Sequence, residues 1–109
     1  MNIADRTINA LQGQQFSMQQ TENAAPSYVV NWASVLQADI IATSTWECTG
    51  TVVIAARANT TSTASARISG EPGRYRVVNR IVTAAGDTDE RIILLTIADN
   101  DGYRVGDYQ

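Results

Sequence analysis

The chain of 109 residues contains no histidine, no lysine and a single cysteine. Without histidine it lacks the commonest general base, the serine and cysteine triads that depend on imidazole, and most zinc chemistry. Cys48 alone can form neither an intramolecular disulfide nor a multi-cysteine metal site, and we interpret it as a small strand residue. The sequence also shows no glycine-rich phosphate loop and no nucleophile elbow. We therefore expect a protein that is not an enzyme and that uses no metal or cofactor.

All positive charges are arginines, and 8 of them stand against 11 acidic residues, for a net charge of -3. No basic run occurs, and phosphate contacts need clustered positive charge, so we expect no binding to nucleic acid. No apolar run is long enough to span a membrane, and residues 1–27 lack the basic start and apolar stretch of a secretory signal. These features predict a soluble protein that is made in the cytoplasm and does not enter a membrane.

The acidic run DNDG resembles the middle of a calcium-binding loop. Aligning Gly102 with the loop glycine places Ile97 and Tyr108 at the first and twelfth ligand positions, where carboxylates are required. This excludes an EF-hand. A looser calcium site that uses Asp99 and Asp101 stays open, although a solvated turn is the simpler interpretation.

Residues 1–27 differ in character from the rest of the chain. The run LQGQQFSMQQTENAAPS is rich in glutamine and poor in large apolar groups, so it cannot bury enough surface to fold by itself. A short helix from Asp5 to Leu11 is conceivable, since Ile3, Ile8 and Leu11 could share a face. We expect an N-terminal arm over residues 1–27, either a disordered leader or a docking arm that a neighbouring subunit orders.

From residue 28 onward, apolar and polar residues alternate in short runs that turn residues separate. Six or more short strands without a convincing helix predict an all-β fold, an immunoglobulin-like antiparallel β-sandwich of about seven strands over residues 28–99, followed by a tail over 100–109. The expected strands are SYVVNWA at 27–33, DIIATSTWEC at 39–48, TVVIAARA at 51–58, NTTSTASARIS at 59–69, RYRVVNRIVT at 74–83 and ERIILLTI at 90–97.

Three aromatic residues are candidates for the structural core. Trp32 and Trp46 each fall in phase with aliphatic neighbours, and in the second case the shared face would include Ile40 and Ala42. An exposed tryptophan pair for stacking against sugars is the alternative. Tyr75 follows the turn signal GEPG, where a tyrosine corner falls in such sandwiches, with its hydroxyl bonded to the backbone upstream.

The last two strands carry apolar residues on both faces. If Tyr75 and every second residue after it face the core, the residues between them face outward. The outward residues of the two strands then lie beside one another. Such an apolar stripe should be covered by the N-terminal arm, by a symmetry mate or by a different protein, unless the last strand is itself covered on both faces. Aliphatic side chains beside arginine, without lysine, are typical of protein interfaces. The expected partner interface consists of Arg76, Val78, Arg80, Val82, Ile92 and Leu94.

Two runs, DIIATSTW from Asp39 and VVNRIVTAAGDTDER from Val77, give the chain a resemblance to a known family over residues 28–99. They resemble the small immunoglobulin-like virion proteins of tailed bacteriophages that are described as fibre-tail adaptors. The chain differs from typical members in having Ile93 in place of an inward aromatic and in its longer leading segment.

The resemblance implies a structural virion component that bridges the tail or neck to receptor-binding fibres without catalysis. We expect it to bind other virion proteins as a homo-oligomer around the tail axis. A capsid decoration protein is an alternative of the same class. A carbohydrate- or surface-binding immunoglobulin-like module is an alternative of another class, with a ligand held by loops near Trp32 or Asp87 to Glu90.

Overall fold

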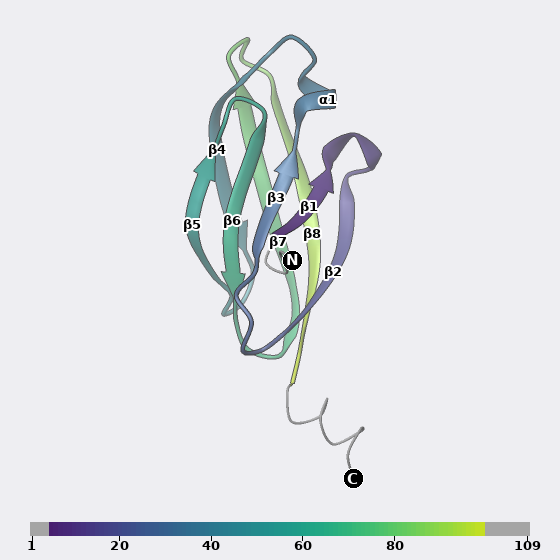
Figure 1. Ribbon diagram of the computed structural model, residues 1–109, viewed down its shortest axis with the longest axis vertical. Coiled ribbons are helices and arrows are strands. Elements are labelled where there is room, and N and C mark those ends of the chain that lie inside the picture. The colour runs from purple at the N-terminus through teal and green to yellow at the C-terminus, as the bar shows by residue number, and fades with distance from the viewer. Residues whose placement is uncertain (1–4, 100–109) are drawn as a thin grey trace.

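A computed structural model describes residues 5–99 and shows two four-stranded sheets packed face to face (Figure 1). The strand order is β1-β3-β6-β5 in one sheet and β2-β8-β7-β4 in the other. The strands are β1 (Asp5–Asn9), β2 (Gln15–Thr21), β3 (Ser27–Asn31), β4 (Ile41–Cys48), β5 (Val53–Asn59), β6 (Thr63–Ser69), β7 (Gly73–Thr83) and β8 (Thr88–Ala98), and the helical segments are the 3₁₀ turn η1 (Ala10–Gln12) and α1 (Ala33–Leu36). Neither helical segment of the described chain has the length and apolar character needed to cross a membrane.

The predicted β-sandwich is confirmed. In their order across each sheet, β1-β3-β6-β5 and β4-β7-β8 occupy the places of strands A-B-E-D and C-F-G in immunoglobulin constant-type domains, with β2 added beside β8. The pairs that join β3 to β6, β5 to β6, β4 to β7 and β7 to β8 are antiparallel, as expected. The pairs of β1 with β3 and of β2 with β8 are parallel, which the alternation of residues within a strand cannot reveal.

The N-terminal segment differs from the arm expected over residues 1–27. β1 lengthens one sheet by pairing with β3, and β2 lengthens the other by pairing with β8 from Gln15, opposite Ile92, to Thr21, opposite Ala98. Figure 1 shows both strands on the same side of the sandwich, with η1 carrying the chain from one sheet to the other. The described part of this segment is therefore built into the sandwich. The tail expected over residues 100–109 lies outside the described residues.

The short helix that was conceivable from Asp5 to Leu11 does not form. Asp5–Asn9 is a strand, and only the next three residues form a 3₁₀ turn. The reason is that the edge of β3 offers the backbone of this segment a full row of hydrogen-bonding partners, so a polar sequence gains regular structure with little burial. Ile8 and Ala10 supply the buried apolar contacts that hold the segment against the core.

The core lies between the two sheets and follows the predicted alternation in most strands. In β6 the buried positions are Ala64, Ala66 and Ile68, and in β7 Val77 and Ile81 point to the same interior. Trp32 is fully buried, and Trp46 joins the same cluster. The indole N–H of Trp46 has no hydrogen-bond partner among the described residues. With both tryptophans inside, neither ring is available to stack on a sugar, which contradicts that part of the carbohydrate-binding alternative.

One predicted inward face is wrong. Ile40 and Ala42 were expected to share the buried face of Trp46, but Ile40 is 45% exposed and Ile41 is buried in its place. A β-bulge between Ile41 and Thr43 shifts the register with β7 and reverses the phase of the residues before it. A single extra residue therefore moves the first part of β4 to the opposite face.

Tyr75 has the geometry of a tyrosine corner at the start of β7. Its hydroxyl donates to the carbonyl oxygen of Glu71 at 2.8 Å, and its ring is half-buried against the core. The ring fits between Gly50 and Gly73, which have φ values of 72° and 152°, and a Cβ at these positions would approach the ring or hydroxyl to 2.9 and 3.0 Å. The turn before β7 is thus fixed from both sides by this one side chain.

Replacing Tyr75 with phenylalanine should lower the free energy of unfolding by about 1 kcal/mol, because the hydroxyl–carbonyl bond is lost while the ring stays in place. Urea denaturation followed by circular dichroism measures this change, and the m-value should be unaltered because the exposed surface hardly changes. A variant as stable as the parent would show that the corner bond makes no net contribution.

Candidate protein-binding surface

The outward side of β7 and β8 carries all six residues of the expected interface, and we call it the outer face. The antiparallel register places Arg76 opposite Leu94, Val78 opposite Ile92 and Arg80 opposite Glu90. The two strands are the longest in the fold, with 11 residues each, and remain in one register along their whole pairing. The outer face is therefore a stiff platform whose residues keep fixed neighbours.

The apolar part of this face is narrower than the sequence predicts. Leu94 is 39% exposed, whereas Ile92 is only 8% exposed although it lies outside the core cluster. Ile92 is flanked by Val78 on β7 and by Gln15 on β2, so the chain covers it itself, contrary to the expectation of open apolar surface. Val78 and Val82 are half-buried. Leu94 is consequently the main apolar contact that the outer face offers to a partner.

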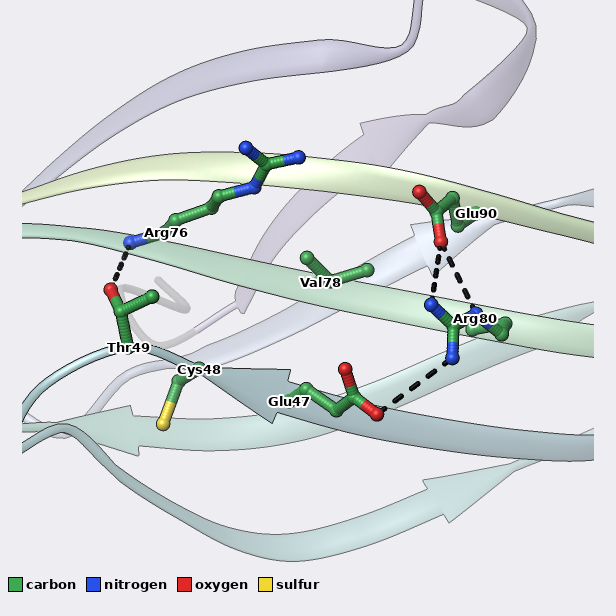
Figure 2. Close-up of a pocket in the computed structure, with 7 residues that line it drawn as sticks. All are labelled: Glu47, Cys48, Thr49, Arg76, Val78, Arg80 and Glu90. Carbon is green, nitrogen blue, oxygen red and sulfur yellow. Dashed lines mark hydrogen bonds and ion pairs between the residues drawn. The ribbon is translucent and has the colours of Figure 1, made fainter.

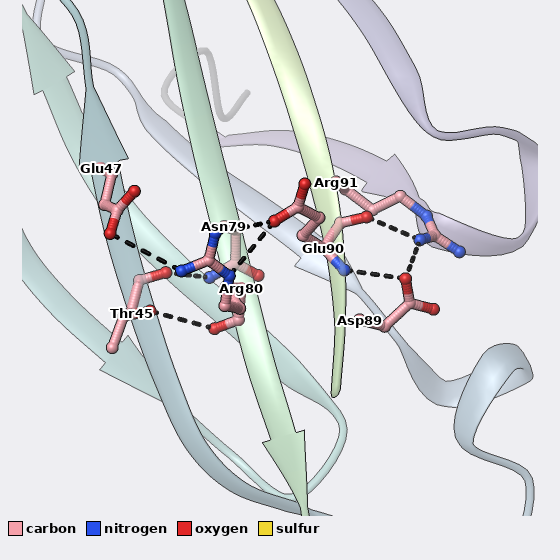
Figure 3. A network of polar contacts seen from close by, with 7 residues as sticks. All are labelled: Thr45, Glu47, Asn79, Arg80, Asp89, Glu90 and Arg91. Atoms are coloured by element: carbon pink, nitrogen blue, oxygen red, sulfur yellow. Dashed lines mark hydrogen bonds and ion pairs between the residues drawn. The ribbon is translucent and has the colours of Figure 1, made fainter. Parts of the chain in front are cut away.

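Arg80 is neutralised within the chain. Its guanidinium lies 3.0 Å from a carboxylate oxygen of Glu90 on β8 and 3.7 Å from one of Glu47 on β4 (Figures 2 and 3). All three side chains are partly exposed, so the pairs contribute little to stability, but the group of one guanidinium and two carboxylates has a net charge of -1 and offers no excess positive charge. A hollow of about 270 Å³ lies beside the group.

A second arginine lies on the inner side of the same strands, and sequence reasoning missed it. Arg91 is 7% exposed, donates through Nε to the carbonyl oxygen of Ala10 at 2.8 Å and pairs with Asp89 at 2.8 Å. Its guanidinium carbon lies 4.8 Å from the centre of the Trp32 ring. The alternation of β8 contains the signal, because Arg91 is in phase with the buried Ile93.

The buried polar network continues from Trp32 across the core. The indole Nε1 donates to the Asn79 side-chain oxygen at 2.9 Å, and the Asn79 amide donates to the Ser44 hydroxyl and to the Thr45 carbonyl at 3.0 and 3.1 Å. Asn79 is fully buried. Its bond with Trp32, which follows β3, joins the two sheets, and its bonds with Ser44 and Thr45 join β7 to β4. Because buried polar groups are costly when unpaired, this network fixes the relative positions of the sheets.

A separate set of contacts fastens the N-terminal strands at the other end of the core. The Tyr28 hydroxyl donates to the Gln20 side-chain oxygen at 2.5 Å, and the Gln20 amide donates to the Ile68 carbonyl at 3.0 Å. Arg6 lies over the Tyr28 ring and donates to the Gln19 carbonyl. Burial raises the pKa of the Tyr28 hydroxyl, and the nearby Arg6 partly opposes that shift. Gln20 thus joins β2 to β3 and β6 of the other sheet, and Arg6 joins β1 to β2.

Three acidic residues near the β7–β8 turn have partners within the chain. Asp89 pairs with the buried Arg91, and Glu90 pairs with Arg80. Hydrogen bonds from the Thr83 hydroxyl and the backbone N–H of Ile40 lower the pKa of the Asp39 carboxyl. Within residues 5–99, no three acidic or cysteine side chains are grouped so that they could hold a metal ion. The calcium site that the sequence leaves open would use Asp99 and Asp101, and Asp101 lies outside the described residues.

A model of the family described as "Podophage GP4 fiber-tail adaptor protein gp77" matches residues 20–96 of the chain. No curated protein sequence matches the chain. The matched region begins at the end of β2 and includes β3 to β7 and most of β8, and so contains the whole outer face of the last two strands. The chain therefore belongs to the podophage fibre-tail adaptor family, and it is a structural component of the virion that joins the tail to its fibres.

Proposed function

We propose that this adaptor binds a neighbouring virion protein through the outer face of β7 and β8. The observation that carries the proposal is the exposure of Leu94 on a stiff platform whose core side is already complete. Arg76 stands opposite Leu94 in the register, and arginine beside exposed aliphatic surface is typical of interface composition. The role consists of presenting this surface and involves no catalytic step.

The same proposal includes the assembly of several copies around the tail axis, formed in the host cytoplasm before joining the particle. A ring of copies would present the outer face repeatedly, so that a weak contact per copy becomes strong binding in the assembly. Light scattering on the purified chain, together with cryo-electron microscopy of the particle, tests this part. A monomer in both settings would remove the homo-oligomer and leave the outer face as a single docking surface.

Replacing Leu94 with arginine should reduce incorporation into particles by about tenfold or more, since burial of one leucine contributes about 1.5 to 3 kcal/mol to an interface. The new side chain would also face the like charge of Arg76 across the strand pair. The measurement is the number of adaptor copies in particles that are assembled with the variant, quantified by mass spectrometry.

Val53→Arg is the matched control, because Val53 is another aliphatic residue, 56% exposed, on β5 of the opposite sheet. Both variants should give the circular dichroism of the parent. Normal incorporation of the Leu94 variant would remove the proposed surface, and equal losses in both variants would show that the effect is not specific to it.

A further inference from the structure

The outer face has two halves that differ in charge balance. In one half, Arg80 is neutralised by Glu47 and Glu90. In the other half, Arg74 and Arg76 are exposed, and neither guanidinium has a hydrogen bond or ion pair within residues 5–99. Figure 2 shows the Arg76 side chain lying over β8, and Arg76 also borders the hollow beside the Arg80 group.

A depression of about 480 Å³ lies over this second half. Among residues 5–99 no carboxylate lines it, although acidic residues outnumber basic ones in the chain as a whole. Side chains two apart on a strand point to the same face about 7 Å from each other, so Arg74 and Arg76 repel one another. Glu47 and Glu90 line the adjoining hollow with Arg76, but both are paired with Arg80. The depression is therefore a local excess of positive charge that an anionic partner would stabilise.

The floor of the depression is apolar. Exposed Leu94 contributes to it, and Met18, Tyr75 and Leu95 border it from the strands around. β2 provides Met18 and the neutral polar residues Ser17 and Gln19, and so no charge. A partner that satisfied the two guanidinium groups alone would leave the leucine exposed, so the matching chemistry combines carboxylates with an apolar side chain.

We propose that this depression binds a segment of another virion protein that carries carboxylates next to an aliphatic or aromatic side chain. The inference rests on the proposed function and specifies the partner chemistry of the same face. Each guanidinium offers a planar fork that pairs with a carboxylate through two parallel hydrogen bonds, and the apolar side chain covers Leu94. A phosphate backbone would satisfy the charges and leave the apolar floor uncovered.

The test uses the purified full chain, labelled with ¹⁵N and with ¹³C methyl groups, and three probes followed by NMR. The probes are a capped peptide of alternating glutamate and leucine, the same peptide with lysine in place of glutamate, and a thymidine oligonucleotide. We expect the acidic peptide to shift the Leu94 methyl signals and the Arg74 and Arg76 Nε–H signals, with a dissociation constant on the order of 1 mM. The other two should leave these signals in place.

Equal shifts with the lysine peptide would overturn the requirement for carboxylates, and binding of the oligonucleotide alone would replace the protein partner with a nucleic acid. Absence of shifts with every probe at millimolar concentration would overturn the proposal.

Variants separate this inference from the proposed function. The pair Arg74→Gln with Arg76→Gln should weaken binding of the acidic peptide and lower particle incorporation about tenfold. Arg57→Gln should change neither, because it removes an exposed positive charge from β5 of the opposite sheet. If Leu94→Arg blocks incorporation and the double variant does not, the outer face is the interface but its partner is not acidic. If none of these variants affects incorporation, the proposed function fails as well.

Discussion

Replacing Arg91 with alanine should lower the free energy of unfolding by about 3 kcal/mol, because the substitution leaves a buried acceptor without its donor and removes a cation from an aromatic face. The acceptor is the carbonyl oxygen of Ala10, a residue with 0% exposure that receives the Arg91 Nε–H. Loss of the cation over Trp32 adds to the cost, whereas Asp89 is partly exposed and can be rehydrated. Denaturation in guanidinium chloride measures the change.

The same variant should loosen the N-terminal segment before the rest of the fold. Arg91 belongs to β8, and its bond to Ala10 fastens η1, which connects β1 to β2. Amide hydrogen exchange in β1 and β2 should therefore accelerate more than exchange in β7, since local opening follows the contacts that were removed.

Arg80→Ala is a matched control from the neighbouring strand. Arg80 likewise forms ion pairs, with two carboxylates, but its side chain is 47% exposed, so its removal should cost about 1 kcal/mol or less. If both alanine variants lose the same stability, the buried contacts of Arg91 contribute no more than surface ion pairs. Unchanged exchange in β1 and β2 would show that Arg91 does not hold the N-terminal segment.

Alternation within each run was sufficient to predict the strands from residue 27 onward and most of their inward faces. It worked best for β6 and β7, where Ala64, Ile68, Val77 and Ile81 are all buried, because one face of each strand meets the core. It failed at Ile40, where a bulge changes the phase without any residue type that marks it.

The N-terminal strands could not be predicted because their stability comes from distant partners. β2 is bonded along its length to β8, which lies more than 70 residues later, and its own outward residues are glutamine and serine. A segment of this composition forms a strand only where it can pair with the open edge of a sheet. The sequence alone does not reveal which strand provides that edge.

The shared face of the six candidate interface residues was predicted, but their exposure and charge balance were not. All six residues lie on one face, yet Ile92 is covered within the chain and Arg80 is neutralised. Both effects depend on which residues of β2 and β4 lie next to the last two strands, and that is a property of the sheet order. The burial of Arg91 is of the same kind, because a charged residue in an inward phase is tolerated only where the fold supplies partners.

Replacing Asn79 with leucine should cost about 2 to 3 kcal/mol although the two side chains have similar size, since it leaves the buried indole N–H of Trp32 without an acceptor. The Asn79 oxygen accepts that bond at 2.9 Å, and both residues have 0% exposure. The amide also donates to the Ser44 hydroxyl and the Thr45 carbonyl, so β4 loses contacts with the core at the same time. Urea denaturation of the variant and the parent measures the difference.

A double-mutant cycle with Trp32→Phe isolates the indole–amide bond. Phenylalanine has no N–H, so in its background the substitution of Asn79 by leucine no longer leaves that donor unpaired and should cost about 1 to 2 kcal/mol less than in the parent. Ser44→Ala removes only a hydroxyl that the Asn79 amide contacts and should cost less than either. An equal penalty for the leucine substitution in both backgrounds would mean that the bond between Trp32 and Asn79 does not stabilise the sandwich, and that the cost arises from the contacts with β4 alone.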